Sequence, residues 1–245
     1  MNVAEQRADI RTADGVMDTW MFQPPGAGPW PAVILYMDVI GIRAELNAMA
    51  ARLAANGYVV ALPNLFYRLG ELPPVDLATF VAPGPDRDRV LARGKTIDGA
   101  KTMSDTAAIL EHLRGARTTG RVGAVGYCMG GGYALRAAGT FPDQVAAAAS
   151  FHGGALATDA PDSPHRLAPT MRGQIYVGVA SQDHSFDEAQ RERLRAALQE
   201  AGTDFEIEVY EGAKHGFAVT GHPVYDAAAA ERHWQALLTL FREAL

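Results

Sequence analysis

The chain has a single cysteine, Cys128, among its 245 residues. One cysteine cannot form an internal disulfide bond, which excludes a disulfide-stapled fold and agrees with a reducing compartment. The sequence also lacks any apolar run near the ~18 residues that a membrane span needs. Residues 1–10 carry Glu5, Arg7 and Asp9 where a signal peptide would have its apolar core. We therefore expect a cytoplasmic protein with no membrane partner.

An excess of positive charge and the common cofactor motifs are also missing. The formal net charge of −6 argues against nucleic acid as a partner. The sequence has no His-Glu-x-x-His, no paired cysteines and no Gly-x-Gly-x-x-Gly after an apolar strand pattern. The segment Arg93-Gly-Lys-Thr96 resembles the end of a phosphate-binding loop, but Arg89 stands where that motif needs glycine. We predict no metal and no cofactor.

Strand and helix patterns alternate along the chain, which we expect to form one domain over residues 1–245. Apolar runs typical of strands buried on both faces of a parallel sheet occupy residues 32–37, 58–62, 121–125, 145–151 and 174–180. Helical patterns follow at residues 43–56, 86–114 (with weak points at Gly94 and Gly99), 133–138, 186–201 and 225–245.

The remaining segments predict the edges of the sheet and its loops. Residues 8–12 and 16–23 flank Ala-Asp-Gly and predict an antiparallel hairpin. Residues 205–210 alternate apolar and acidic side chains, as an edge strand does. Residues 63–85 predict a long lid or binding loop, and residues 155–172 a loop. The predicted fold is therefore α/β, with a mostly parallel twisted sheet, helices on both faces and an N-terminal antiparallel hairpin.

The sharpest motif surrounds the cysteine. Gly126 and Gly130 flank Cys128 in the pattern Gly-x-nucleophile-x-Gly, at a turn from a predicted strand into a predicted helix. The glycines leave room for a strained turn, and the free N–H groups of the helix start favour a thiolate and a developing oxyanion. A buried structural cysteine at a glycine-rich turn is the alternative interpretation.

Two partners complete a candidate catalytic triad. Asp183 comes 55 residues after Cys128, and His215 comes a further 32 residues on, each just past a predicted strand. Carboxyl ends of parallel strands share one edge of a sheet, and the order nucleophile, acid, histidine is that of α/β-hydrolases. Alternatively, Asp183 or Ser185 caps the next helix, and His215 is an ordinary loop histidine.

Other residues on the same edge are candidates for binding. The N–H of Met129, directly after the nucleophile, can serve an oxyanion hole, with Val39 or Ile40 as the second donor. Asp38 either modulates the thiol or caps a helix. His152 either lines the substrate pocket or hydrogen-bonds backbone.

The remaining histidines carry weaker signals. His184 stands beside Asp183, His222 precedes a proline, and His112 and His233 fall within predicted helices, where surface or core positions are expected.

The motifs Asp38-Val-Ile-Gly41, Gly126-Tyr-Cys-Met-Gly-Gly131, Gln182-Asp-His184 and Lys214-His-Gly-Phe217 together resemble the dienelactone hydrolase family. This is the cysteine-nucleophile branch of the α/β-hydrolases, and the likeness runs over most of the chain. The resemblance implies the triad Cys128, Asp183 and His215, with oxyanion donors at Val39 and Met129. Phe217 is a further candidate for the substrate pocket, with His152.

The chain also departs from the family pattern. Asp38 stands where the family typically has a glutamate that controls the resting thiol. Val219 stands where dienelactone-cleaving members have an arginine for the substrate carboxylate, so Arg68, Arg87 or Arg89 is the candidate replacement.

The sequence therefore predicts a hydrolase that acts on a lactone or small carboxylic ester through an acyl-enzyme, with dienelactone-type substrates among the candidates. Its partner is a small molecule, and no pattern specifies an oligomeric state. The alternative is a non-catalytic ligand-binding or thiol redox-responsive relative.

Overall fold

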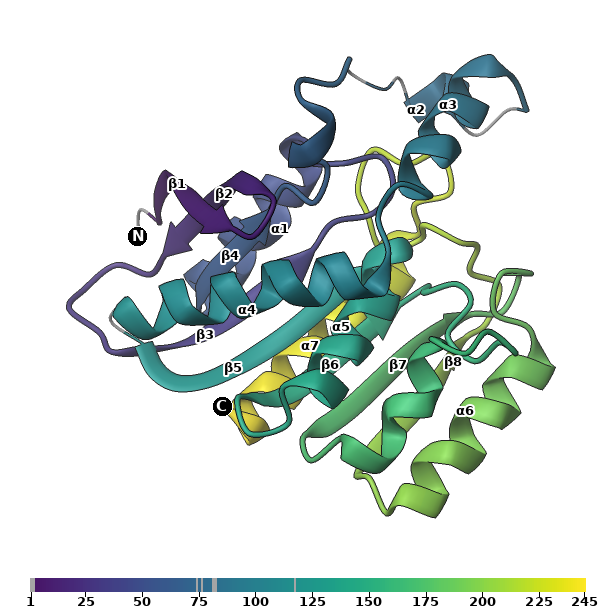
Figure 1. Cartoon of the computed structure of the whole chain (residues 1–245). Coiled ribbons are helices and arrows are strands. Elements are labelled where there is room, and N and C mark those ends of the chain that lie inside the picture. The colour runs from purple at the N-terminus through teal and green to yellow at the C-terminus, as the bar shows by residue number, and fades with distance from the viewer. Residues whose placement is uncertain (1–2, 74, 76, 81–82, 117) are drawn as a thin grey trace.

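The structure is a computed structural model, and it describes residues 3–73, 75, 77–80, 83–116 and 118–245. Within those residues eight strands form one sheet in the order β1-β2-β4-β3-β5-β6-β7-β8 (Figure 1). The strands are β1 (Ala4–Thr12), β2 (Gly15–Gln23), β3 (Trp30–Tyr36), β4 (Val59–Pro63), β5 (Thr118–Tyr127), β6 (Val145–Phe151), β7 (Gln174–Ala180) and β8 (Phe205–Tyr210). The pairs β1–β2 and β2–β4 are antiparallel, and the other five pairs are parallel. The predicted fold class is confirmed.

Helices cover both faces of this sheet. One face carries α4 (Gly99–Gly115), α5 (Met129–Thr140) and α6 (Glu188–Ala201), and the other carries α1 (Ala44–Ala55) and α7 (Ala227–Ala244) (Figure 1). The short helices α2 (Leu77–Phe80) and α3 (Pro85–Gly94) lie together beyond the end of the sheet. No helix in the described part of the chain combines the length and apolar content of a membrane span.

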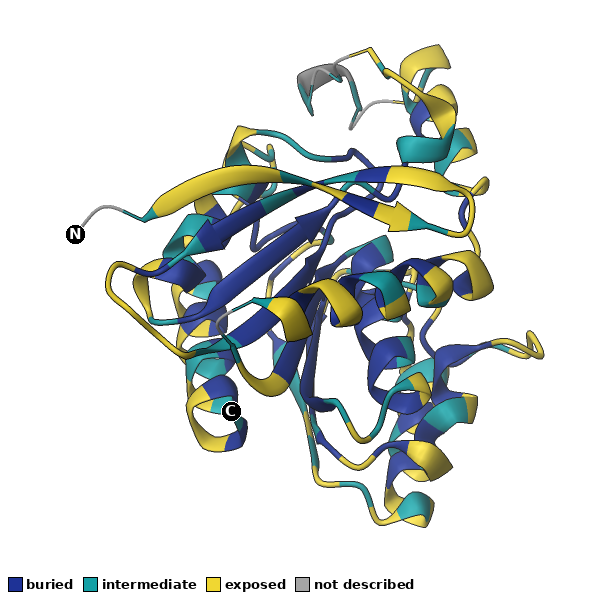
Figure 2. Ribbon diagram, turned by 60° about the vertical axis from the view of Figure 1, so that its left-hand side comes forward, coloured by how far each residue is buried: buried dark blue, intermediate teal, exposed yellow. Residues whose placement is uncertain are grey.

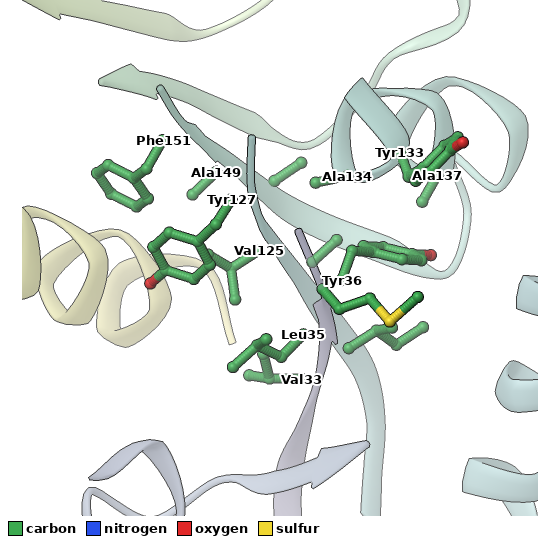
Figure 3. Close-up of a cluster of buried hydrophobic side chains, with 14 of the residues drawn as sticks. Val33, Leu35, Tyr36, Val125, Tyr127, Tyr133, Ala134, Ala137, Ala149 and Phe151 are labelled. Atoms are coloured by element: carbon green, nitrogen blue, oxygen red, sulfur yellow. The ribbon is translucent and has the colours of Figure 1, made fainter. Parts of the chain in front are cut away.

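The centre of the sheet is buried on both sides. The middle strands are dark blue along their length in Figure 2, whereas the outward faces of the helices are yellow. Side chains of neighbouring residues alternate between the faces: Tyr36 points toward α5, where its ring lies 6.4 Å from that of Tyr133, while Leu35 and Tyr127 point toward α7 (Figure 3). The continuous apolar runs of the sequence follow from this double burial.

Most predicted elements are confirmed, and the differences lie at the surface. The predicted break between Gly94 and Gly99 separates α3 from α4, and β6, β7 and β8 have their predicted bounds. The prediction of a plain loop at residues 155–172 is wrong, because residues Pro164–Thr170 form a 3-10 helix that begins with proline.

Two further predictions need correction: the start of the N-terminal hairpin and the structure within residues 63–85. The predicted hairpin begins too late, since β1 starts at Ala4 and its first residues are polar and exposed on an edge strand. The predicted lid at residues 63–85 contains α2 and the 3-10 helix Tyr67–Leu69; residues 74, 76, 81 and 82 lie outside the described residues.

A buried polar contact joins α7 to the sheet beside the predicted nucleophile. The Nδ1 of His233 lies 2.6 Å from the Ala230 carbonyl oxygen, and its Nε2 lies 2.9 Å from the Tyr127 hydroxyl. A carbonyl only accepts, so Nδ1 carries the proton and Nε2 accepts from Tyr127. Burial lowers the pKa of His233 to about 3. The ring is therefore neutral and fully partnered.

This contact predicts a measurable pH dependence of stability. Below about pH 6.5 His233 is protonated in the unfolded chain but stays neutral in the folded chain. As the pH falls, this difference lowers the free energy of unfolding of the wild type by about 1.4 kcal/mol per pH unit. In His233→Gln the amide can accept from Tyr127 but does not titrate. The free energy of unfolding of the wild type should therefore fall by about 2 kcal/mol relative to that of the variant between about pH 6.5 and about pH 4.5. Urea unfolding at the two pH values measures this difference. His112→Gln, on the exposed side of α4, is the control for the loss of a histidine elsewhere on the chain. A difference between wild type and His233→Gln that does not change with pH would contradict the prediction.

Candidate active site

A cavity of about 680 Å³ opens at the carboxyl ends of the parallel strands. Most of the predicted site residues line it: Asp38, Val39, Cys128, Met129, His152, Asp183 and His215. Helix α3 contributes Arg87, Leu91 and Gly94 to the lining, and the segment between β8 and α7 contributes Val219 and Val224. The cavity therefore gathers residues from loops that are far apart in the sequence.

Cys128 sits on the strained turn between β5 and α5. Its backbone has φ 56° and ψ −120°, a conformation that costs a non-glycine residue about 1–3 kcal/mol. A Cβ on Gly126 would lie 1.9 Å from the carbonyl oxygen of Gly130, and a Cβ on Gly130 would lie 2.3 Å from that of Tyr36. The glycines are required because strand and helix backbones touch there, which holds the half-buried thiol at the edge of the cavity.

Asp183 and His215 form a short hydrogen bond. His215 Nδ1 lies 2.6 Å from Asp183 Oδ2, and the other carboxylate oxygen accepts from the backbone N–H and the hydroxyl of Ser185, at 2.8 and 2.7 Å. The cap of α6 is Asp187, which accepts from Gln190 N–H. Neither Asp183 nor Ser185 is therefore the cap of that helix, and the Asp183 carboxylate is committed to His215 and Ser185.

The electrostatics of this pair favour a charged imidazole. Burial lowers the pKa of His215, but the charge of Cys128 and the hydrogen bonds to Asp183 and Cys128 outweigh it and raise the pKa to about 10. Burial likewise opposes ionisation of Asp183, yet its hydrogen bonds to His215 and Ser185 hold its pKa below the ordinary value. The arrangement favours an imidazolium at His215 that is oriented by the Asp183 carboxylate.

Two backbone N–H groups near Cys128 are free to bind an oxyanion. The N–H of Ile40 donates to Asp38 Oδ1 at 2.9 Å, which leaves the N–H of Val39. Met129 is the first residue of α5, where the N–H has no helical partner. In the described residues no hydrogen bond engages either N–H. A Cβ on Gly94 would lie 2.6 Å from Val39 Cγ2 and 3.8 Å from Met129 Sδ. The side chains of Val39 and Met129 therefore both lie next to Gly94 of α3.

Asp38 is held by an arginine that the sequence analysis did not identify. The Arg43 guanidinium donates two hydrogen bonds, of 2.8 and 2.7 Å, to the Asp38 carboxylate, and both side chains are largely buried. The described residues show no hydrogen bond between Asp38 and Cys128. Modulation of the thiol by Asp38 remains a prediction, and it would act through a carboxylate that is already paired.

Arg93 is a second residue that the sequence analysis missed. Its guanidinium donates to the carbonyl oxygens of Val39, at 3.3 Å, and of Ile40. It thereby fastens α3 to the loop that presents the Val39 N–H. Only a contact across 54 residues reveals this, and no local motif signals it.

The aromatic candidates occupy different depths. His152 lines the cavity floor and is 2% exposed. Phe217 is fully buried behind it, with its ring 5.5 Å from that of His152 and stacked 4.8 Å from Tyr210, and the structure does not bring it into the cavity lining. His184 and His222 also line the cavity.

Of the three candidate arginines, one faces the cavity. Arg68 binds the buried Asp105 with two hydrogen bonds of 2.8 Å each. Arg89 pairs with Asp86 on the exposed side of α3. Arg87 lines the cavity together with Lys95.

Known proteins resemble this chain over most of its length. The model of the "Dienelactone hydrolase family" matches residues 17–245. The carboxymethylenebutenolidase of Rhodococcus opacus is 29% identical over 224 residues, covering 89% of this chain and 83% of that protein. A protein of Escherichia coli, provisionally named carboxymethylenebutenolidase, is 29% identical over 229 residues, covering 88% of this chain and 78% of that protein.

Solved structures share the fold. A provisionally named dienelactone hydrolase from Klebsiella pneumoniae superposes with a TM-score of 0.87 at 22% identity, covering 99% of both chains. A dienelactone hydrolase-like promiscuous phosphotriesterase from metagenomic libraries superposes with a TM-score of 0.81 at 21% identity, covering 100% of this chain and 99% of that chain.

The contact between strand and helix backbones at the nucleophile predicts the effect of one methyl group. Gly126→Ala should lower the free energy of unfolding by about 3 kcal/mol or more, since its Cβ would overlap the Gly130 carbonyl. Gly132→Ala in α5 is the control: the nearest atoms lie 3.8 Å from its Cβ position, and alanine favours the helix by about 1 kcal/mol. Urea unfolding measures both, and equal stability of the two variants would contradict the prediction.

Proposed function

The chain belongs to the dienelactone hydrolase family, a family of hydrolases, and we propose that it hydrolyses lactones or small carboxylic esters with Cys128 as nucleophile. The observation that carries the proposal is the hydrogen bond of 2.6 Å between Asp183 and His215, made at the cavity wall that also presents Cys128. A thiol needs such an oriented base to become a nucleophile.

Acylation begins from the thiolate–imidazolium pair. The Cys128 sulfur attacks the carbonyl carbon, a carbon–sulfur bond forms, and the carbonyl electron pair moves onto oxygen. The N–H groups of Val39 and Met129 hold that oxyanion. When the carbonyl re-forms, the bond to the leaving oxygen breaks, and His215 gives its proton to that oxygen. In a lactone the leaving alcohol stays attached to the acyl group.

Deacylation returns the enzyme to its starting state. His215, now neutral and held by Asp183, takes a proton from water as the water oxygen attacks the thioester carbon. The same two N–H groups hold the second oxyanion. Its collapse breaks the carbon–sulfur bond, releases the acid product and restores the thiolate beside protonated His215. No added co-reactant besides water is needed.

The charges around the cavity favour an anionic substrate. The carboxylates of Asp38 and Asp183, which line the cavity, are each bound to a cationic side chain, whereas Arg87 and Lys95 add positive charge on the α3 side. A carboxylate on the substrate would therefore be attracted to that side. This supports dienelactone-type substrates, in line with the names of the relatives, with Arg87 replacing the arginine that the family places at Val219.

A non-catalytic redox-responsive role is not favoured. A sensor thiol needs exposure and a low pKa, but it has no need of two free N–H groups beside it or of a carboxylate behind the histidine. The single free thiol also supports the cytoplasm as the working compartment.

Removal of the nucleophile tests the proposal. Cys128→Ala should lower kcat/KM at least about 1,000-fold for the best substrate in a screen of lactones and small esters, because no other group can form the acyl-enzyme. His112→Gln, on the surface, should leave the rate unchanged. Full activity of Cys128→Ala, or of wild type whose thiol has been stoichiometrically alkylated, would refute the mechanism.

The anionic preference has its own test. Arg87→Ala should raise KM about tenfold for an ester that carries a free carboxylate, and it should leave the uncharged methyl ester of that substrate unaffected. The neighbouring Arg89→Ala, which removes the same charge from the exposed side of α3, should change neither. Equal increases in KM for Arg87→Ala and Arg89→Ala would contradict a specific role of Arg87, because they would show that only the net charge of the protein affects binding of the carboxylate.

A further inference from the structure

His152 is a buried polar side chain without a partner. It is 2% exposed, and neither of its ring nitrogens has a hydrogen-bond partner among the described residues. Burial lowers its pKa well below the ordinary value, with the nearby His215 adding to the effect. The neutral ring has one N–H donor and one lone pair, and burying either of them without a partner is unfavourable.

The backbone holds His152 beside the nucleophile. Tyr127 and Phe151 are paired on β5 and β6, so the next residue on each strand, Cys128 and His152, leave the sheet side by side. The Cys128 N–H donates to the Phe151 carbonyl at 3.2 Å, and the His152 N–H donates to the Gly178 carbonyl at 2.8 Å. Both residues have positive φ, 56° and 40°. Strain of this kind persists where the surrounding structure enforces it.

Packing alone does not explain a histidine at this position. Its ring lies 5.1 Å from the ring of His215, 5.5 Å from that of Phe217 and 5.8 Å from that of Tyr127, the first two in edge-to-face geometry. A phenylalanine would make the same contacts without burying an unpaired donor and acceptor. The ring nitrogens are shielded from bulk water, but the residue lines the cavity. A partner must therefore arrive through that cavity.

We propose that His152 is a specificity-determining residue that hydrogen-bonds an ether, hydroxyl or carbonyl oxygen of the substrate close to the reacting carbonyl. This rests on the proposed esterase and lactonase function. The reacting carbonyl carbon must contact Cys128. The leaving oxygen, or the attacking water, must contact His215, whose ring is 5.1 Å from that of His152. Hydrogen-bond lengths then place the bound oxygen within about three covalent bonds of the reacting carbon.

The competing explanation is that His152 only supports the ring of His215. In that case its replacement would slow the hydrolysis of every ester by the same factor. A matched pair of substrates separates the two explanations: p-nitrophenyl methoxyacetate and p-nitrophenyl butyrate have acyl groups of equal length, and they differ by one ether oxygen in place of a methylene group.

The experiment compares kcat/KM for both esters in wild type, His152→Phe and His152→Asn. His152→Phe should lose about tenfold for methoxyacetate and less than about threefold for butyrate, because only the ether oxygen loses a donor. His152→Asn keeps a donor and tolerates positive φ, so it should recover part of the methoxyacetate rate. Thermal melts check that each variant is folded, and His152→Leu replaces His152→Phe if the latter does not fold.

The outcomes separate this inference from the proposed function. Equal losses for the two esters, or no loss for either, would overturn the assignment of His152 while leaving the nucleophile and its reaction intact. Absence of Cys128-dependent turnover of both esters in the wild type would overturn the proposed function, and the assignment of His152 with it.

Discussion

The structure depends on close backbone contacts at the turn between β5 and α5, where Gly126 of β5 meets Gly130 of α5 and Gly130 meets Tyr36 of β3. No side chain fits between them. This closeness forces the positive φ of Cys128, points the N–H of Met129 away from the helix, and puts the thiol at the rim of the central strands. The flanking strands then bring Asp183 and His215 to the same rim, since parallel strands end together.

The two carboxylates that line the cavity are each paired with a cationic side chain and with hydrogen-bond donors. Asp183 is bound by His215 and Ser185, and Asp38 is bound by Arg43 and the N–H of Ile40. Arg93 and Gly94 of α3 contact the loop at Val39, so the cavity wall that carries Arg87 is joined to that loop. The proposed substrate-binding side chain and the proposed oxyanion donor are therefore connected through α3. The His152 ring differs from these groups, because neither of its nitrogens has a hydrogen-bond partner in the described part of the chain.

Elements with strong local signals were predictable from the sequence. The strands β6, β7 and β8 have clear apolar or alternating patterns with turn residues at both ends, and the turn at Cys128 has glycines at the required spacing. The start of β1 was missed because its exposed polar residues carry no apolar pattern. The positions of Asp183 and His215 followed from the topology of a parallel sheet. Their chemical roles, and those of Val39 and Met129, remain predictions.

What could not be predicted depends on contacts between distant residues or on depth within the fold. Arg93 was considered only as part of a phosphate-loop-like segment, and its hold on the Val39 loop spans 54 residues. The isolation of the His152 ring is a property of the packed interior, and the burial of Phe217 behind it is another. The lone cysteine has a practical consequence: since the chain holds no other thiol, a sulfhydryl-directed mass tag or fluorophore reads out this cavity without background, and its stoichiometry counts competent molecules in any preparation.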